Sequence, residues 1–234
     1  MFFHKASISV LALLILSGCS GYGVTFQSAP IAQLSNCYSG LVGDWRIIEG
    51  NRSEQSADKN DFISISANCS TMYSVTLRQK SDKKANDVDD LRESGKQQIQ
   101  FATVDDMAYV VVTPKETSFD VTPDIKTPSG KIIYLINPGK DGLILRSVDI
   151  DKTIQLILAR KISGQIFVDR DNPDAKHAAN VYVRGDAKQI AGYLATLDMY
   201  SDERFLLISA TPAERKLLSK AIKHYERDNK NRLK

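Results

Sequence analysis

The sequence predicts an α+β protein: a mainly antiparallel, eight-stranded β-barrel-like domain followed by a small α/β or helical C-terminal segment. Three observations support this prediction. From residue 37 to about residue 162, apolar and polar residues alternate in short runs, which is the pattern of half-buried strands. Compact turn sequences separate most of these runs, as expected for antiparallel neighbours. After residue 163, the apolar spacing in part of the chain changes to that of amphipathic helices.

Eight strands are predicted in the first of these parts. Tyr73, Val75 and Leu77 alternate with polar residues, whereas residues 107–113 are almost all apolar and are expected to be buried on both faces. Because a closed barrel removes exposed sheet edges, eight antiparallel strands of this length favour a barrel. The predicted strands cover residues 45–50, 62–66, 71–79, 97–103, 107–113, 131–137, 143–150 and 153–162.

Two connections between the predicted strands are long. Residues 80–96 are densely charged and polar, and residues 114–130 contain three prolines. Neither segment shows the alternation of a half-buried strand. Both are therefore predicted to be loops at a rim of the barrel or mobile flaps.

The C-terminal segment is predicted to contain two strands and two helices. A capping box starts each helix, since Asp186 is followed by Gln189 and Thr211 is followed by Glu214. Pro212 at the first helical position strengthens the second start. The strands are predicted at residues 180–184 and 205–209, and the helices at residues 186–197 and from residue 211 onward.

The last predicted helix has two chemically different faces. Lys216, Lys220 and Lys223 lie mostly on the side opposite its apolar residues, so they are expected to face solvent. The apolar face comprises Leu217, Leu218, Ala221, Ile222 and Tyr225.

The amino-terminal residues have the layout of a secretory signal. A short positive region precedes an apolar run over residues 8–16, which is much shorter than the roughly 20 residues of a membrane-spanning helix. The run ends at Leu16-Ser17-Gly18-Cys19, which resembles the lipobox of bacterial lipoproteins. The alternative is an ordinary signal peptide in which the cysteine is incidental.

The lipoprotein resemblance implies that Cys19 receives a diacylglycerol, that the chain is cut just before it, and that the new amino group is acylated. Several acyl chains hold a protein stably on a bilayer without a spanning segment. Ser20, rather than an acidic residue, follows the cysteine. In Gram-negative lipoproteins this favours the outer membrane, so the expected location is the outer membrane, lipid-anchored and facing the periplasm.

Four parts of the chain are predicted. Residues 20–36 are rich in Gly, Ser, Gln and Ala, which is typical of a tether. The predicted parts are a signal peptide over 1–18, a lipidated tether over 19–36, the barrel-like domain over 37–165 and the C-terminal α/β segment over 166–234.

Cys37 and Cys69 remain after Cys19 is assigned to the anchor. An exported compartment is oxidising, so a disulfide between the two is expected. The loop that it closes would contribute roughly 3–4 kcal/mol in the chain-entropy description. The alternative is two buried free thiols. A metal site is not expected, because the spacing is unsuitable and no histidine is close in sequence.

The charge of the chain gives no sign of a nucleic-acid partner. The formal net charge is +3 over 234 residues, and basic and acidic residues are interspersed. Nucleic-acid-binding domains carry a larger and more clustered positive charge. We therefore expect no nucleic acid among the partners.

Gly43-Asp44-Trp45 at the first predicted strand resembles the Gly-x-Trp of lipocalins and related calycins. The resemblance covers this tripeptide and the strand count. It implies a tryptophan packed across one end of the barrel and a possible apolar cavity. The residues expected to line it are Trp45, Tyr73, Val75, Leu77, Phe101 and Tyr134. The alternatives are a core tryptophan in an unrelated β-domain, and a barrel filled by its own side chains.

No catalytic constellation is visible. The chain has no Gly-x-Ser-x-Gly, no His-Glu-x-x-His, no Cys-x-x-Cys and no phosphate-binding glycine loop. His177 and His224 are expected to lie at the surface. The sequence therefore predicts neither an enzyme nor a cofactor or metal site, although a pair of carboxylates that converge only in space would escape such a search.

Three functions follow from these observations, in order of preference. The first is a non-enzymatic, lipid-anchored envelope protein that acts as an accessory or scaffold through contacts with an envelope protein partner. The second is a calycin-like carrier of a small apolar ligand. The third is a periplasmic hydrolase whose carboxylates the sequence does not identify.

Overall fold

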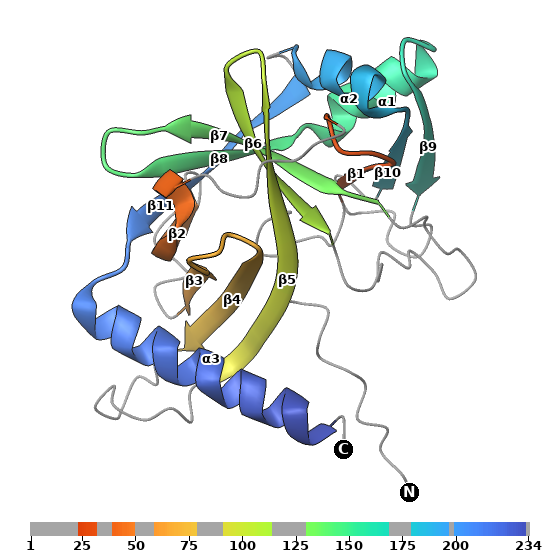
Figure 1. Ribbon diagram of the computed structural model, residues 1–234. Helices are drawn as coiled ribbons and strands as arrows, with labels where there is room; N and C mark the ends of the chain where they lie inside the picture. The colour runs from red at the N-terminus through yellow and green to blue at the C-terminus, as the bar shows by residue number, and fades with distance from the viewer. Residues whose placement is uncertain are drawn as a thin grey trace, which may run out of the picture.

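The computed structural model describes residues 23–31, 39–49, 59–78, 91–113, 130–168, 179–196 and 199–232. Eight strands form a closed barrel in which every neighbouring pair is antiparallel, as the sequence predicts. The strands are β2 (Gly43–Glu49), β3 (Lys59–Ile65), β4 (Thr71–Arg78), β5 (Leu91–Val104), β6 (Met107–Thr113), β7 (Ile132–Pro138), β8 (Leu143–Val148) and β11 (Tyr200–Ser209). The order around the barrel is β11-β2-β3-β4-β5-β6-β7-β8 (Figure 1).

The eighth strand of the barrel comes from the C-terminal segment. β11 lies between β8 and β2, where Leu207 is opposite both Leu143 and Ile47. The predicted strand over residues 153–162 is wrong, because Ile150–Leu158 forms helix α1. The predicted boundary between the barrel-like domain and the C-terminal segment, after residue 165, therefore places β11 apart from the other seven barrel strands.

The local sequence of α1 explains the incorrect strand prediction. Residues 153–158 alternate like a strand, but the same residues also present an apolar side at helical spacing. Asp149 favours the helix as its N-cap residue, because its side chain accepts a hydrogen bond from the backbone N–H of Lys152 at 2.9 Å. The hydroxyl of Thr153 donates to the Asp149 carbonyl at 2.6 Å within the buried start of the helix.

β5 begins earlier than predicted. Its bounds are Leu91–Val104, so residues 91–96 are strand and not loop. This first part pairs with β4 alone, where Leu77 is opposite Leu91, and pairing with β6 starts at Gln98. The backbone hydrogen bonds to β4 extend β5 through this polar run, and alternation of side chains does not report such bonds.

A three-stranded sheet lies beside the barrel. It has the order β1-β10-β9, with β1 parallel to β10 and β10 antiparallel to β9. Its strands are β1 (Val24–Phe26), β10 (Ala179–Arg184) and β9 (Ser163–Val168). β1 falls in the part predicted to be a tether, yet all three of its residues are buried. A bridge between Phe26 and Lys131 connects β1 to the start of β7.

Three apolar clusters hold these parts together. The first fills the barrel interior, and the second joins the outer faces of β6 and β7 to the small sheet through residues such as Tyr109 and Val181. β6 contributes Val110 and Val112 to the first cluster and Tyr109 and Val111 to the second. Residues 107–113 are therefore buried on both faces, as predicted.

The third cluster lies between the barrel and α3 (Pro212–Arg232). Leu218 and Ala221 of the helix pack on Phe62 and Val75 of β3 and β4. Figure 1 shows α3 crossing the barrel beside β4 and the lower end of β5. The helix covers part of the outer surface of the barrel.

Both capping boxes predicted from the sequence are confirmed. In α2 (Ala187–Leu194), Asp186 accepts from the Gln189 N–H, and the Gln189 side chain accepts from the Asp186 N–H, each at 2.9 Å. At α3, the Glu214 N–H donates to Thr211 at 3.3 Å, and the Thr211 N–H donates to Glu214 at 2.6 Å. Local sequence thus determines where these helices begin.

Candidate functional site

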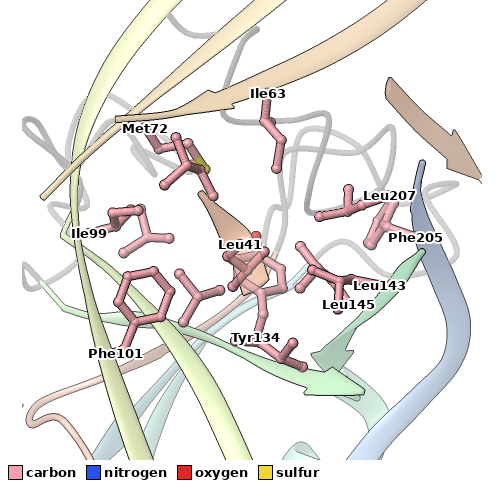
Figure 2. Close-up of a cluster of buried hydrophobic side chains, with 14 of the residues drawn as sticks. Leu41, Ile63, Met72, Ile99, Phe101, Tyr134, Leu143, Leu145, Phe205 and Leu207 are labelled. Carbon is pink, nitrogen blue, oxygen red and sulfur yellow. The ribbon is translucent and has the colours of Figure 1, made fainter. Parts of the chain in front are cut away.

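The barrel interior is the first candidate site, because the sequence predicts a ligand cavity there. Leu41, on a short 3-10 helix (Ser39–Leu41) just before β2, lies in the middle of the interior cluster and is 1% exposed. Figure 2 shows Leu41 surrounded by side chains from several strands, among them Met72, Phe101, Tyr134 and Leu207. Side chains of the protein itself therefore occupy this part of the barrel.

Gly43 and Trp45 fix the entry of the chain into the barrel. The indole N–H of Trp45 donates to the Leu41 carbonyl at 2.9 Å, and Trp45 packs against the interior cluster. Gly43 has a φ of 133°, a backbone conformation that L side chains rarely adopt. The Gly-x-Trp tripeptide thus holds Leu41 in place at the start of strand β2.

Three of the six predicted cavity residues lie at the interior cluster: Trp45, Phe101 and Tyr134. Burial raises the pKa of the Tyr134 phenol, which keeps this side chain neutral inside the barrel. The three residues offer apolar contact and one phenol.

Tyr73 and Val75 lie on the outer side of the barrel, which corrects their predicted place in a cavity wall. Val75 packs beneath α3, and the Tyr73 hydroxyl donates to Glu226 of that helix at 2.5 Å. Their alternation with polar residues was correctly recognised, but the apolar face of β4 is covered by a helix. The side chain of Leu77 lies outside the described residues.

The inward side of β3, β4 and β5 is partly polar. Ile63, Met72 and Ile99 belong to the interior cluster, so residues two positions away point to the same side. These include Asp61, Ser74, Thr76 and Gln97. The alternation in β4 does not reveal this group, because Tyr73, Val75 and Leu77 are the residues expected to line the interior.

One interior polar group has no hydrogen-bond partner. The Thr76 hydroxyl donates to Asp61 at 2.7 Å. In contrast, the buried Ser74 hydroxyl has no partner in the described part of the chain. Ser74 is 5% exposed, so this oxygen is shielded from bulk water. Buried hydroxyls in native proteins normally have a partner, so this position has room for one hydrogen bond from a water or a ligand.

The free edge of the small sheet is the second candidate site. Among the described strands, β9 pairs with β10 only, so its other edge offers backbone groups that no described strand uses. β9 contains neither charge nor proline. Edge strands in soluble proteins usually carry such residues, which discourage pairing with other chains. Figure 1 shows β9 at the outer border of this sheet.

Exposed apolar side chains lie beside the β9 edge. Val168 at the end of β9 is 53% exposed, and Leu158 at the end of α1 is 71% exposed. α1 packs against β9 and β10 and ends just before β9 begins, so Leu158 lies near the start of β9 and Val168 lies at its other end. Arg160 and Lys161 are exposed directly before β9, so the start of the β9 edge combines an apolar side chain with two basic ones, and its far end is apolar.

The predicted cysteine sites lie partly outside the described residues. Cys19 and Cys37 are not among them. Cys69 is fully buried in the turn between β3 and β4, next to the interior cluster. The disulfide between Cys37 and Cys69 stays a prediction, and so does the lipid on Cys19.

The described residues contain no group of three or more His, Cys, Asp and Glu residues that could hold a metal ion. His224 is half-exposed on α3, where Nδ1 lies 3.1 Å from Asp228, and His177 lies outside the described residues. Within the same described ranges, no helix combines the length and the apolar character needed to cross a bilayer.

Comparisons with protein-family models, with curated proteins and with solved structures give no match for this chain.

Proposed function

We propose that this protein is a non-enzymatic, lipid-anchored component of the cell envelope that acts as an accessory or scaffold by binding another envelope protein. The lipobox-like sequence before Cys19 supports the anchor and the periplasm-facing outer-membrane location. The observation that carries the protein contact is the uncharged free edge of β9.

The β9 edge suits an extended segment of a partner protein. Such a segment can add a fourth strand to the small sheet, with main-chain hydrogen bonds supplying affinity and alternate side chains supplying specificity. Val168 and Leu158 would contact apolar side chains of the partner. Arg160 and Lys161 favour an acidic residue next to that apolar sequence.

Site-specific photocrosslinking in intact membranes tests this proposal. A photoreactive residue at Val168 should give one discrete adduct with another protein. Replacement of Leu158 by Lys should abolish the adduct while leaving the unfolding midpoint unchanged, because Leu158 is 71% exposed.

Ile48 provides the matched control, because it is an exposed apolar residue, 39% exposed, on β2 of the barrel. A photoreactive residue at Ile48 should give no adduct of the same mass. Equal adducts from both positions, or no adduct from Val168, would contradict binding at β9.

The anchor has its own test. Mass spectrometry of the protein purified from membranes should show a chain that begins at Cys19 and carries three acyl chains. Replacement of Cys19 by Ser should leave an uncleaved, unacylated chain. An unmodified Cys19 in the mature protein would rule out the anchor without affecting the β9 proposal.

The predicted disulfide can be checked on the same sample. Without reduction, peptide mapping should recover Cys37 and Cys69 in one cross-linked fragment. Recovery of both cysteines as alkylated thiols from protein unfolded without reductant would show that the bond does not form.

A second candidate function is a carrier of a small ligand, and Ser74 favours it. A ligand that brings a hydrogen-bonding group to the inward side of β4 would satisfy the unpartnered hydroxyl. Native mass spectrometry of the purified protein should then show a bound small molecule that is lost after Ser74→Ala. The same mass for protein purified natively and after refolding would argue against a carrier.

A further inference from the structure

α3 carries a continuous basic stripe. The stripe consists of Lys216, Lys220, Lys223, Arg227 and Lys230, which follow one another at alternating spacings of four and three residues. On an α-helix this spacing places side chains in one row along the axis. At about 1.5 Å per residue, the row extends for roughly 20 Å. All five residues are exposed.

The stripe lies opposite the face that packs on the barrel. Leu218 and Ala221 are buried against the barrel, and Tyr225 is half-buried on the same side. With about 100° of rotation per residue, Lys220 and Arg227 point away from these residues by about half a turn. The barrel therefore packs on the opposite side of α3, and the stripe is exposed with respect to the described part of the chain.

The acidic residues of α3 lie off the stripe and have other partners. Glu214 caps the helix and contacts the Arg46 guanidinium at 3.3 Å. Glu226 accepts the hydrogen bond from Tyr73. Asp228 lies 3.1 Å from His224, and its approach to Arg227 is longer, at 4.0 Å.

No carboxylate of the described residues neutralises the lysines of the stripe. In the described part of the chain, Lys216, Lys220, Lys223 and Lys230 have no ion-pair partner. A surface helix with interspersed charges would pair some of them at i, i+4. This helix instead separates its charges, with cations in one row and carboxylates on its flanks.

We propose that the basic stripe of α3 docks the protein on an anionic lipid surface. This inference rests on the proposed membrane anchor, because lipid attached at Cys19 keeps the domain near headgroup phosphates. A row of exposed lysines attracts anionic lipids additively over a flat surface, and the attraction falls with salt. Lipid chains and a polybasic patch are a known combination of membrane-binding signals.

Docking through the stripe leaves the β9 edge available. α3 and β9 lie on different sides of the barrel in Figure 1. A domain held on the membrane by α3 would therefore present β9 away from α3, where a partner protein can reach it. The two surfaces differ in chemistry, since α3 presents a row of five basic residues and β9 presents an uncharged strand edge with basic residues before its start.

Lysine reactivity provides the test on the full mature protein. The protein is placed in vesicles of phosphatidylcholine alone or mixed with phosphatidylglycerol, and a water-soluble acylating reagent labels its lysines. Mass spectrometry then gives the labelling rate at each residue. Lys216, Lys220 and Lys223 should be protected several-fold in the anionic vesicles at low salt, and protection should disappear at high salt.

Three exposed lysines away from α3 are internal controls: Lys140, Lys161 and Lys188. Their labelling rates should not depend on the lipid. Equal protection of both sets, or protection that persists in neutral vesicles, would overturn docking through the stripe. Stronger protection by a single-stranded oligonucleotide than by anionic vesicles at equal salt would also overturn it, in favour of a nucleic-acid surface.

Charge-removing variants separate this inference from the anchor. For a chain that begins at Ser20, and so carries neither the lipid nor the apolar run over residues 8–16, replacement of Lys216, Lys220 and Lys223 by Gln should lower partitioning into anionic vesicles by roughly a hundredfold at low salt. The same replacement at Lys140, Lys161 and Lys188 should have a much smaller effect. If Cys19 carries no lipid but this difference persists, the anchor is wrong and the stripe is correct. If the difference is absent, the stripe proposal fails whatever the state of Cys19.

Discussion

Tyr73 links the barrel to α3 through a single side-chain hydrogen bond to Glu226. Burial is the main reason that its pKa rises from 10.0 to about 12, and the hydrogen bond and the negative charge of Glu226 add to it. An ionised tyrosine could no longer donate and would repel the carboxylate. Lys96 also lies over the Tyr73 ring, with its nitrogen 5.5 Å from the ring centre.

The Tyr73 contact predicts a loss of stability at alkaline pH. Because the folded pKa is higher than the unfolded one, this contribution is complete below pH 10.0 and is lost as the pH rises toward about 12. Tyr73→Phe should lower the free energy of unfolding by about 1 kcal/mol at neutral pH and should flatten that alkaline loss. Urea unfolding across pH checks this, with Tyr182→Phe on β10 as the control. An identical pH profile for Tyr73→Phe would contradict it.

Leu41 is the residue on which the interior packing depends most directly. Leu41→Ala should lower the free energy of unfolding by about 3 kcal/mol, since it removes a side chain from the middle of the interior cluster. Chemical denaturation measures the change. Leu158→Ala is the control, and it should have almost no effect because Leu158 is 71% exposed. A cost below about 1 kcal/mol for Leu41→Ala would mean that the barrel interior is loosely filled.

At the scale of elements, α1 is held on the small sheet by a close approach at Gly164. A Cβ at this position would lie 2.6 Å from the Ile157 side chain of α1 and 2.8 Å from the Tyr182 carbonyl oxygen of β10. The backbone oxygen can move little, because β9 and β10 are paired there. Only glycine lets the helix and the sheet meet at this distance.

Two glycine-to-alanine substitutions should therefore change the free energy of unfolding in opposite directions. Gly164→Ala should lower the free energy of unfolding by about 2 kcal/mol, because the added carbon overpacks the contact between α1 and the sheet. Gly192→Ala on α2 should raise it by up to about 1 kcal/mol, because nothing lies within 4 Å and alanine favours the helix. Thermal or urea unfolding measures both, and the same sign for both changes would be inconsistent with this packing.

The sequence predicts where helices begin, but it does not predict which face of a strand points into the barrel. Asp186 and Thr211 begin helices through bonds to residues three positions later, so nearby sequence is sufficient. The alternation in β4 correctly predicts two faces. It does not indicate that Tyr73 and Val75 face outward. The outer face of β4 is apolar because α3 covers it, so both faces of the strand carry apolar residues. The candidate ligand site was therefore only partly predictable.

At the scale of the whole molecule, closure of the barrel depends on β11. β11 pairs with β2 on one side and β8 on the other, although it follows α1, α2 and the small sheet in the chain. Without β11, the edges of β2 and β8 would be unpaired. The C-terminal part is thus structural for the barrel and not an appendage.

Two truncations test this role of β11. A chain that ends at residue 165 lacks β11 and should show no cooperative unfolding and no near-ultraviolet circular dichroism signal from Trp45. A chain that ends at residue 211 lacks α3 but keeps β11. It should fold with reduced stability, because Phe62 and Val75 become exposed. Cooperative folding of the shorter chain would show that seven strands suffice.

The sequence by itself determined the class of fold, most of the strand positions, the two-sided burial of residues 107–113 and the starts of α2 and α3. These features depend on residues close together in the chain. Only the tertiary structure decided that β11 closes the barrel, that Leu41 fills its interior and that Tyr73 and Val75 lie on the side covered by α3. Those features depend on contacts between distant segments, and alternation or helical spacing defines the faces of an element without saying what will cover them.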